Sequence, residues 1–189
     1  MKKIPDNAKK VFEGVIFDVY HWEQEMFDGS TATFEAIKKR DTVVVVPTSE
    51  GKIIVNDEEQ PGRPTFISLP GGMCEKESTD PLLEIKRELA EETGYTTDDW
   101  KLLFVADPLG HHKIEWNNHF YIAKNCKQTV TPHLDPGEKI QTRLITLEEF
   151  LELRNNPRFR NKDLIPYLEK AASSEEEKQT LQALLGITP

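Results

Sequence analysis

The segment from residue 80 to residue 94 carries the strongest structural signal in the sequence. Asp80 is a good N-cap residue, Pro81 suits the first position of a helix, and Gly94 suits the position just past its end. Apolar residues recur between these limits at helical spacing. They predict one buried stripe, formed by Leu82, Ile85, Leu89 and Leu83. The chain therefore contains an amphipathic helix that must pack on another layer.

The same helix concentrates negative charge. Glu88, Glu91 and Glu92 stand at i, i+3 and i+4, and Glu84 extends the row by one turn. Residues at this spacing are surface neighbours, and like charges there destabilise a helix. A hard divalent cation with oxygen ligands would offset the repulsion. The alternative interpretation is a solvated acidic face with basic neighbours as counter-charges.

Length and charge narrow the class of protein. A chain of 189 residues, with 37% hydrophobic and 30% charged residues, is typical of one globular domain with a sizeable core. A net charge of −9 argues against nucleic acid or an anionic membrane as a partner. An anionic small substrate would need metal ions or a local basic cluster to offset that field.

The cysteines and the N-terminus indicate a compartment. Cys74 and Cys126 form neither a disulfide framework nor zinc-ligand spacing. The basic N-terminal residues precede no apolar stretch, and no later run is long enough to span a bilayer. We expect a cytoplasmic protein.

Strand signals surround the helix. Asp28-Gly29 is a hairpin signal, and TVVVV at 42–46 is typical of a strand buried on both faces. A polar segment, Asp57–Pro64, is predicted to be a loop. The other expected strands are Val11–Tyr20, Thr31–Ile37, Lys52–Val55, Phe66–Leu69, Trp100–Val105, Trp116–Ala123 and Lys139–Ile145; the other expected helices are 147–153, Asp163–Ala172 and Glu175–Leu185.

This order of elements predicts an α/β fold in which helices cover a mixed central sheet in an α/β/α sandwich. We expect one domain over residues 1–189. Its parts are an N-terminal β region over about 1–40, a core over about 41–155 and C-terminal helices over about 156–189.

The segment Gly71–Tyr95 resembles the Nudix box, G-x5-E-x7-R-E-U-x-E-E-x-G-U, where U is aliphatic or aromatic. The second half matches in register, with Tyr95 as a loose fit at the last place; the matching residues are Arg87, Glu88, Leu89, Glu91, Glu92, Gly94 and Tyr95. The first half departs from the pattern. Counting back from Arg87 places the box glutamate at Thr79, whereas counting forward from Gly72 places it at Ser78. The loop thus carries one extra residue and lacks the glutamate, for which Glu77 or Glu75 would have to substitute.

The resemblance implies a site for Mg²⁺ or Mn²⁺. Glu88 and Glu92 are the first metal ligands it implies, with Glu91 sharing or bridging and the carbonyl of Gly71 adding a further ligand. Arg87 resembles the family arginine that orients the glutamates. Metal ions would neutralise a diphosphate and lower the pKa of a bound water.

A second acidic segment lies downstream, at Leu134–Ile140. Glu138, with Asp135 as a fallback, resembles the extra metal ligand or catalytic base of ADP-ribose pyrophosphatases in this family. The alternative is an ordinary Asp-Pro-Gly turn with exposed carboxylates.

The N-terminal β region resembles the same subgroup, in which it helps to build a homodimer and part of the substrate site. The chain lacks an arginine-rich stretch often seen there, and Arg63 is the nearest remaining cation. His111, His112 and Lys113 are further candidates for phosphate contact. The alternative for Arg63 is an ordinary loop residue, and for the two adjacent histidines a solvent-exposed position.

The leading hypothesis is a metal-dependent pyrophosphohydrolase that acts on a nucleoside diphosphate linked to another group. ADP-ribose is the favoured substrate, followed by related nucleotide sugars, and the product is a nucleoside monophosphate. The second hypothesis is a catalytically weak Nudix-fold module that binds a nucleotide and regulates a partner. A third is a purely structural dimer whose acidic face binds no metal.

Overall fold

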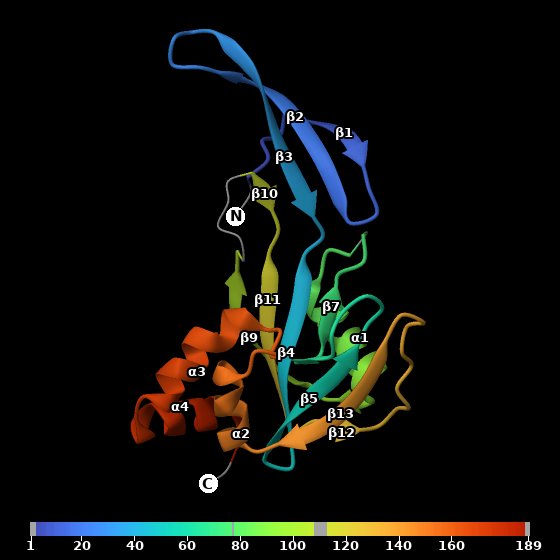
Figure 1. Cartoon of the computed structure of the whole chain (residues 1–189), viewed down its shortest axis with the longest axis vertical. Helices are drawn as coiled ribbons and strands as arrows, with labels where there is room; N and C mark the ends of the chain where they lie inside the picture. The colour runs from blue at the N-terminus through green and yellow to red at the C-terminus, as the bar shows by residue number, and fades with distance from the viewer. Residues whose placement is uncertain (1–2, 77, 108–112, 188–189) are drawn as a thin grey trace.

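The computed structural model describes residues 3–76, 78–107 and 113–187, and these form a layered core from which a β extension projects (Figure 1). The extension is one sheet in the order β1-β2-β3-β10. Its strands are β1 (Lys9–Glu13), β2 (Phe17–Glu25), β3 (Thr31–Lys39) and β10 (Ile114–Glu115). The expected hairpin turn at Asp28-Gly29 is confirmed, because it joins β2 to β3. The single strand expected over Val11–Tyr20 is wrong, because the chain turns back at Gly14 and pairs β1 with β2.

The core sheet is mixed and runs in the order β13-β5-β4-β11-β9, with β6 attached to β5 and β7 attached to β4. Only β4 and β11 among these neighbours run parallel. The strands are β4 (Thr42–Ser49), β5 (Lys52–Glu59), β6 (Phe66–Ser68), β7 (Gly71–Met73), β9 (Asp99–Ala106), β11 (Asn118–Lys124) and β13 (Lys139–Ile145). A separate pair is formed by β8 (Tyr95–Thr96) and β12 (Lys127–Gln128).

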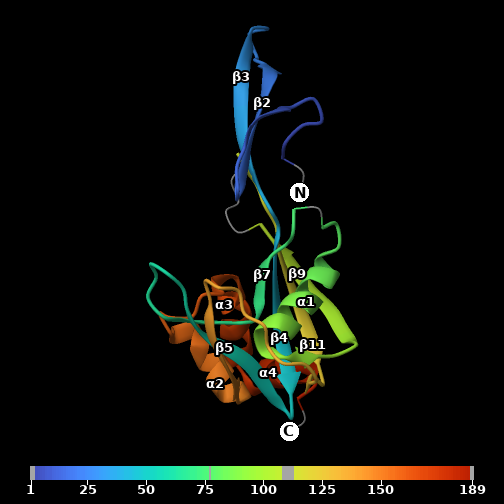
Figure 2. The same ribbon diagram turned by 90° about the vertical axis from the view of Figure 1, so that its right-hand side faces the viewer.

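Helices cover both faces of the core sheet (Figures 1 and 2). One face carries α1 (Pro81–Thr93); the other carries α2 (Leu147–Glu152), α3 (Ile165–Ala172) and α4 (Glu175–Leu185), with short 3₁₀ turns at Leu153–Asn155 and Lys162–Leu164. The predicted α/β/α sandwich is therefore confirmed. No helix among the described residues is long and apolar enough to cross a membrane.

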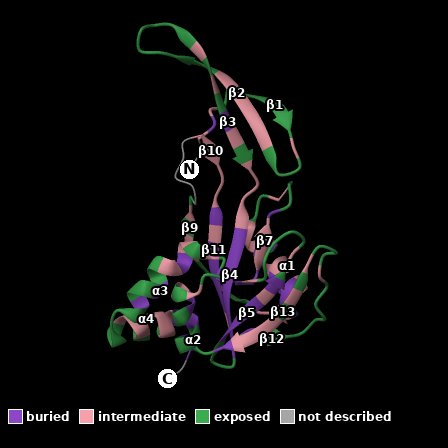
Figure 3. Ribbon diagram, viewed as in Figure 1, coloured by how far each residue is buried: buried purple, intermediate pink, exposed green. Residues whose placement is uncertain are grey.

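Strand β4 shows why the core is layered in this way. Val43 and Val45 pack with α1, whereas Val44 and Val46 pack with the C-terminal helices. Successive side chains of a strand point to opposite faces, so a strand between two helical layers needs apolar residues at every position. Figure 3 shows buried residues concentrated on β4, β5 and β11 and exposed residues over much of the extension.

Helix α1 has the predicted ends. The side chain of Asp80 accepts a hydrogen bond from the Leu82 backbone N–H, and Gly94 adopts a left-handed conformation with φ of 75°. Leu83 does not belong to the buried stripe, because it is 61% exposed. The acidic row is not a solvated face either, because Glu84 and Glu92 are only 7% and 6% exposed.

The predicted loop at Asp57–Pro64 is wrong in its first part. Strand β5 continues to Glu59, because Asn56, Asp57 and Glu58 pair with β6 on one side and β13 on the other. Backbone pairing on both sides holds a polar segment in the sheet that its sequence does not favour. This extension of β5 places Asn56 and Glu58 beside α1.

Candidate active site

The glycines of β7 let this strand pass close to both the sheet and α1. Gly71 has φ of +152°, and a Cβ on it would lie 2.1 Å from the carbonyl oxygen of Val43. A Cβ on Gly72 would lie 2.6 Å from Oε1 of Glu88. Gly71 therefore requires glycine, whereas a side chain at Gly72 would displace the carboxylate of Glu88. The result is a strand whose backbone lies against the carboxylate of a helix residue.

Arg87 holds three carboxylates of α1. Its guanidinium donates to Glu84 at 3.1 Å, to Glu88 at 2.7 Å and to Glu91 at 2.5 Å. A planar guanidinium with five donors suits this arrangement better than a lysine would. The orienting role that the resemblance implies for Arg87 stays a prediction.

Glu92 is the most deeply buried carboxylate of the row. It accepts hydrogen bonds from Nδ2 of Asn56 at 2.9 Å and from the backbone N–H of Gly71 at 3.3 Å. Burial raises its pKa well above the ordinary value, and the charges of Glu58 and Glu88 raise it further. The fold thus holds a carboxyl group where its negative charge is costly.

Three other carboxylates share this environment. Burial raises the pKa of Glu88 to about 7, against the opposing effect of Arg87. Burial also raises the pKa of Glu58 and of Glu138, and the charge of Glu138 acts on Glu58, Glu88 and Glu92. Glu58 was missed by the sequence interpretation because it lay in the supposed loop. It is buried, and its carboxylate accepts a short hydrogen bond from Ser68.

We define the acidic cluster as Glu58, Glu88, Glu92 and Glu138, with Glu91 at its edge. Its donors are hard carboxylate oxygens in a partly buried site with surplus negative charge, which is the chemistry that Mg²⁺ or Mn²⁺ favours. Among residues 3–76, 78–107 and 113–187, no three acidic, histidine or cysteine side chains are gathered closely enough to hold an ion. In this structure three of the carboxylates are hydrogen-bonded to other side chains, Glu88 to Arg87, Glu92 to Asn56 and Glu58 to Ser68.

Comparison with known proteins identifies the family. The model of the NUDIX domain matches residues 38–168. The chain belongs to the Nudix family. It is 31% identical over 150 residues to the ADP-ribose pyrophosphatase of Bacillus subtilis (strain 168), covering 77% of this chain and 79% of that protein. It is 29% identical over 150 residues to the methanol dehydrogenase activator of Bacillus methanolicus, with the same coverage of both chains.

A solved structure described as an ADP compounds hydrolase has the same fold. It superposes with a TM-score of 0.67 over 86% of this chain and 88% of that one, at 18% identity. The family match and the ADP-ribose pyrophosphatase relative make this chain a Nudix hydrolase. Its α1 and β7 are the elements that carry the Nudix box.

The altered loop of this Nudix box is held by Glu84. The carboxylate of Glu84 accepts from the Glu75 backbone N–H at 3.3 Å, from the Ser78 side chain and from Arg87. Glu77 lies outside the described residues, and Thr79 lies beside Ser78 in the wall of a cavity. The loop therefore has an anchor on α1 even though Ser78 and Thr79 occupy the places expected for the box glutamate.

Arg160 is a cation beside the acidic cluster that the sequence did not single out. Its Nη1 lies 4.0 Å from Oε2 of Glu58, and its guanidinium lies 4.9 Å from the centre of the Phe66 ring. Its backbone N–H donates to the carbonyl of Ile67 at 2.8 Å, which fixes the segment against β6. The only signal in the sequence was an Arg-rich stretch near residues 154–160 with no motif around it.

The other predicted substrate contacts are dispersed. Arg63 is exposed in the turn after β5. Lys113 packs in the extension, with Nζ 4.4 Å from the centre of the Phe34 ring. His111 and His112 lie outside the described residues. Of the predicted site residues, the structure thus brings together Gly71, Arg87, Glu88, Glu91, Glu92 and Glu138.

Proposed function

We propose that this Nudix protein hydrolyses the diphosphate bond of a nucleoside diphosphate linked to another group and releases a nucleoside monophosphate. ADP-ribose is the first candidate and related nucleotide sugars are the next. The observation that carries the proposal is the acidic cluster held against the Gly71-Gly72 backbone. The similarity to an ADP-ribose pyrophosphatase supports the choice of substrate.

The residues divide into binding, orienting and proton-accepting roles. Glu88, Glu92 and the carbonyl of Gly71, with Glu91 and Glu138, would hold Mg²⁺ or Mn²⁺. A divalent ion bound there supplies charge neutralisation of the diphosphate and a more acidic water. Arg87 fixes the directions of Glu88 and Glu91.

Residues at the edge of the acidic cluster accept the proton and bind phosphate in this proposal. Glu138 or Glu91 accepts the proton of the attacking water, because both carboxylates are more exposed than Glu92. Arg160 binds an oxygen of one of the two phosphates of the substrate, either the one that leaves with the nucleoside or the other. The contact of its guanidinium with the Phe66 ring and with Glu58 supports this role, because both hold the cation beside the acidic cluster.

Hydrolysis of a panel of nucleoside diphosphate compounds in Mg²⁺ or Mn²⁺ tests the proposal. Wild type should turn over ADP-ribose, and Glu92→Gln should reduce kcat/KM by about 100-fold or more, because metal ions supply several kcal/mol of transition-state stabilisation. Glu169→Gln, which removes one charge from an exposed position on α3, is the control and should keep full activity. Equal turnover by wild type and Glu92→Gln would contradict the metal assignment.

The β extension carries the surface that we propose for assembly. The extension exposes apolar side chains that would form part of a homodimer interface; they are Val11, Phe12, Val15, Ile16, Phe17, Met26 and Phe27. The substrate is a small molecule, with no nucleic acid or membrane as partner, and the compartment is the cytoplasm.

One observation favours a second function, a nucleotide-binding regulatory module with little turnover. The first half of the Nudix box is altered, with Ser78 and Thr79 at the places expected for its glutamate. The name of one relative, a methanol dehydrogenase activator, is a precedent for regulation. Calorimetry and a hydrolysis assay at high Mn²⁺ distinguish the two functions. Binding of ADP-ribose without its hydrolysis would favour the regulatory module over the hydrolase.

A further inference from the structure

The loop at residues 156–161 runs beside β6 and pairs with it. Ile67, in the middle of β6, donates from its backbone N–H to the carbonyl of Arg158 at 2.9 Å and accepts from the Arg160 backbone N–H at 2.8 Å. Phe159, between these two arginines, forms a parallel bridge with Ile67, and its side chain is fully buried. The loop is therefore fixed to the core instead of lying free on its surface.

The side chain of Asn161 continues this pairing beyond the end of β6. Successive N–H groups of a strand point to opposite edges, so the N–H of Leu69 points to the same edge as that of Ile67. Leu69 follows the last residue of β6 and is only 2% exposed. Its N–H donates to Oδ1 of Asn161 at 2.8 Å. Because a buried N–H without an acceptor is costly, this contact fixes where the chain goes after β6.

The segment Leu69–Gly71 leads from this contact into the proposed metal site. The carbonyl of Pro70 accepts from the Val45 backbone N–H at 3.0 Å, and the N–H of Gly71 donates to Glu92 at 3.3 Å. Three consecutive residues are thus held by the loop, by β4 and by α1 in turn. The carbonyl of Gly71, one of the proposed metal ligands, ends this segment. Planar peptide units join the three residues, so a displacement at the first is passed to the last.

We propose that Asn161 is a positioning residue for the metal site, acting through Leu69 on the carbonyl of Gly71. This inference rests on the metal site of the proposed function and adds a residue that touches neither the metal nor the substrate. Groups that hold metal ligands in place typically change metal affinity by about 10- to 100-fold when they are replaced. A loop near the C-terminus would in this way set the affinity of a site built on β7 and α1.

Titration of the full chain with Mn²⁺, followed by the electron paramagnetic resonance signal of the free ion, measures metal affinity without substrate. Asn161→Leu keeps the approximate size of the side chain and removes the acceptor, so the Kd for Mn²⁺ should rise by about tenfold or more. Asn161→Asp keeps an acceptor oxygen and should restore most of the wild-type affinity. If Asn161→Leu does not fold, Asn161→Ala removes the same acceptor with a smaller side chain.

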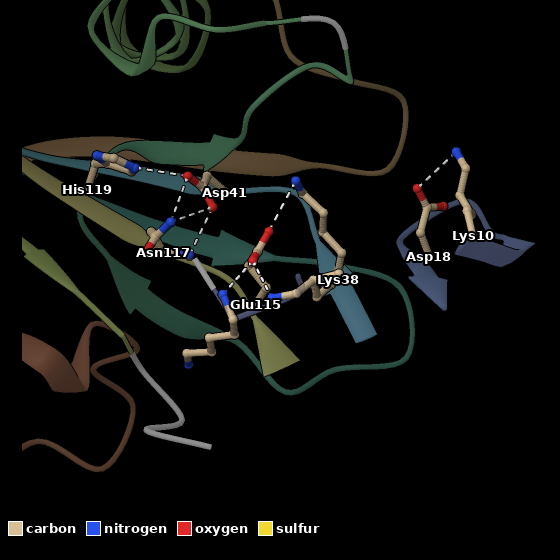
Figure 4. Close-up of polar contacts among 9 residues, drawn as sticks. Lys10, Asp18, Lys38, Asp41, Glu115, Asn117 and His119 are labelled. Atoms are coloured by element: carbon tan, nitrogen blue, oxygen red, sulfur yellow. Dashed lines mark hydrogen bonds and ion pairs between the residues drawn. The ribbon is translucent and has the colours of Figure 1, made fainter. Parts of the chain in front are cut away.

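Asn117→Leu is the matched control, because it makes the same chemical change at another contact between distant segments. Nδ2 of Asn117 donates to both carboxylate oxygens of Asp41, at 3.3 and 3.2 Å, in the two connections between the extension and the core (Figure 4). Thermal unfolding in a chelator should show a lower Tm for both leucine variants. Only Asn161→Leu should also lose affinity for Mn²⁺.

The outcomes separate this inference from the proposed hydrolysis. Equal Mn²⁺ affinity in wild type and Asn161→Leu overturns the inference and leaves the hydrolysis standing. An equal loss of affinity in Asn161→Asp, or in Asn117→Leu, also overturns it, because the loss would not depend on the acceptor at Leu69. A wild-type protein that binds Mn²⁺ but hydrolyses no nucleoside diphosphate contradicts the proposed function alone, and a wild-type protein that binds no Mn²⁺ overturns both.

Discussion

Single residues decide the electrostatics of this protein. Glu88 lies against Gly72 and is paired with Arg87, yet burial still raises its pKa to about 7. Glu92, deeper in the same cluster, has two hydrogen-bond donors and a raised pKa. The cluster is therefore costly to keep charged in the absence of a cation, and this cost can be measured through pH.

The pH dependence of stability in a chelator should differ between wild type and Glu88→Gln. The folded-state pKa of about 7 lies above the ordinary value of 4.5, so the folded state holds the proton more tightly. The stabilisation from this proton is complete below pH 4.5 and is lost as pH rises through about 7. The free energy of unfolding of wild type should fall relative to Glu88→Gln across this window, by about 3 kcal/mol at most.

Chemical denaturation at a series of pH values measures this difference. A saturating concentration of Mn²⁺ is the matched condition, because a bound cation keeps the wild-type carboxylate charged at lower cost. The difference should shrink or reverse there. A difference that stays constant between pH 4.5 and pH 8 in the chelator would show that Glu88 is not held in a buried environment.

Short elements place these residues. Strand β7 brings backbone against α1 only because glycine occupies its first two positions. The local sequence predicted a strand over Phe66–Leu69, just before these glycines, but not the pairing of Gly71 and Gly72 with Val44 and Val43. That pairing joins segments far apart in the chain, and hydrophobic burial of β4 drives it.

Substitution of Gly72 by alanine should damage function more than folding. The new Cβ would lie within 3 Å of all three atoms of the Glu88 carboxylate group, whose flexible side chain can move away. We expect a loss of stability of about 1–2 kcal/mol and a loss of activity of about tenfold or more, from displacement of a proposed metal ligand. Thermal unfolding and kinetics in Mg²⁺ measure the two effects.

Gly137 offers the matched control for Gly72. No atom lies within 4 Å of a Cβ placed on it, and its φ is not positive. Gly137→Ala should therefore change stability by less than about 0.5 kcal/mol. If Gly72→Ala behaves like Gly137→Ala in both assays, the close contact between β7 and Glu88 has no functional role.

At the scale of the whole molecule, the extension projects from the core (Figure 1). Several of its large apolar side chains are exposed. Val15, in the turn between β1 and β2, is 89% exposed, and Phe12 is 59% exposed. Apolar side chains gathered on a protruding sheet mark an interaction surface. A second copy of the chain is the partner we propose.

Val15→Asp should shift the protein from dimer to monomer, because a charge buried at an apolar interface is costly. Sedimentation equilibrium measures the assembly. Leu83→Asp provides the control, because Leu83 is also an exposed apolar residue, at 61%, but lies on α1 of the core. A wild-type protein that sediments as a monomer, or a dimer that Val15→Asp leaves intact, would contradict this interface.

The sequence by itself determined the features that depend on near neighbours in the chain. The limits of α1 follow from Asp80, Pro81 and Gly94, because capping hydrogen bonds and left-handed stops are local. The apolar run of β4 fixed a strand between two layers, because alternate side chains point to opposite faces. The spacing of Glu88, Glu91 and Glu92 predicted their common row for the same local reason.

Only the tertiary structure decided what surrounds that row. Glu58 joins the acidic cluster because β5 continues between β6 and β13, and Arg160 joins it because its backbone bonds to Ile67. Both contacts arise from pairing between segments that are distant in sequence, and no local preference of polar residues specifies such pairing. The same long-range packing buries Glu92. A row of charges in the sequence thus became a buried site through the folding of the whole chain around it.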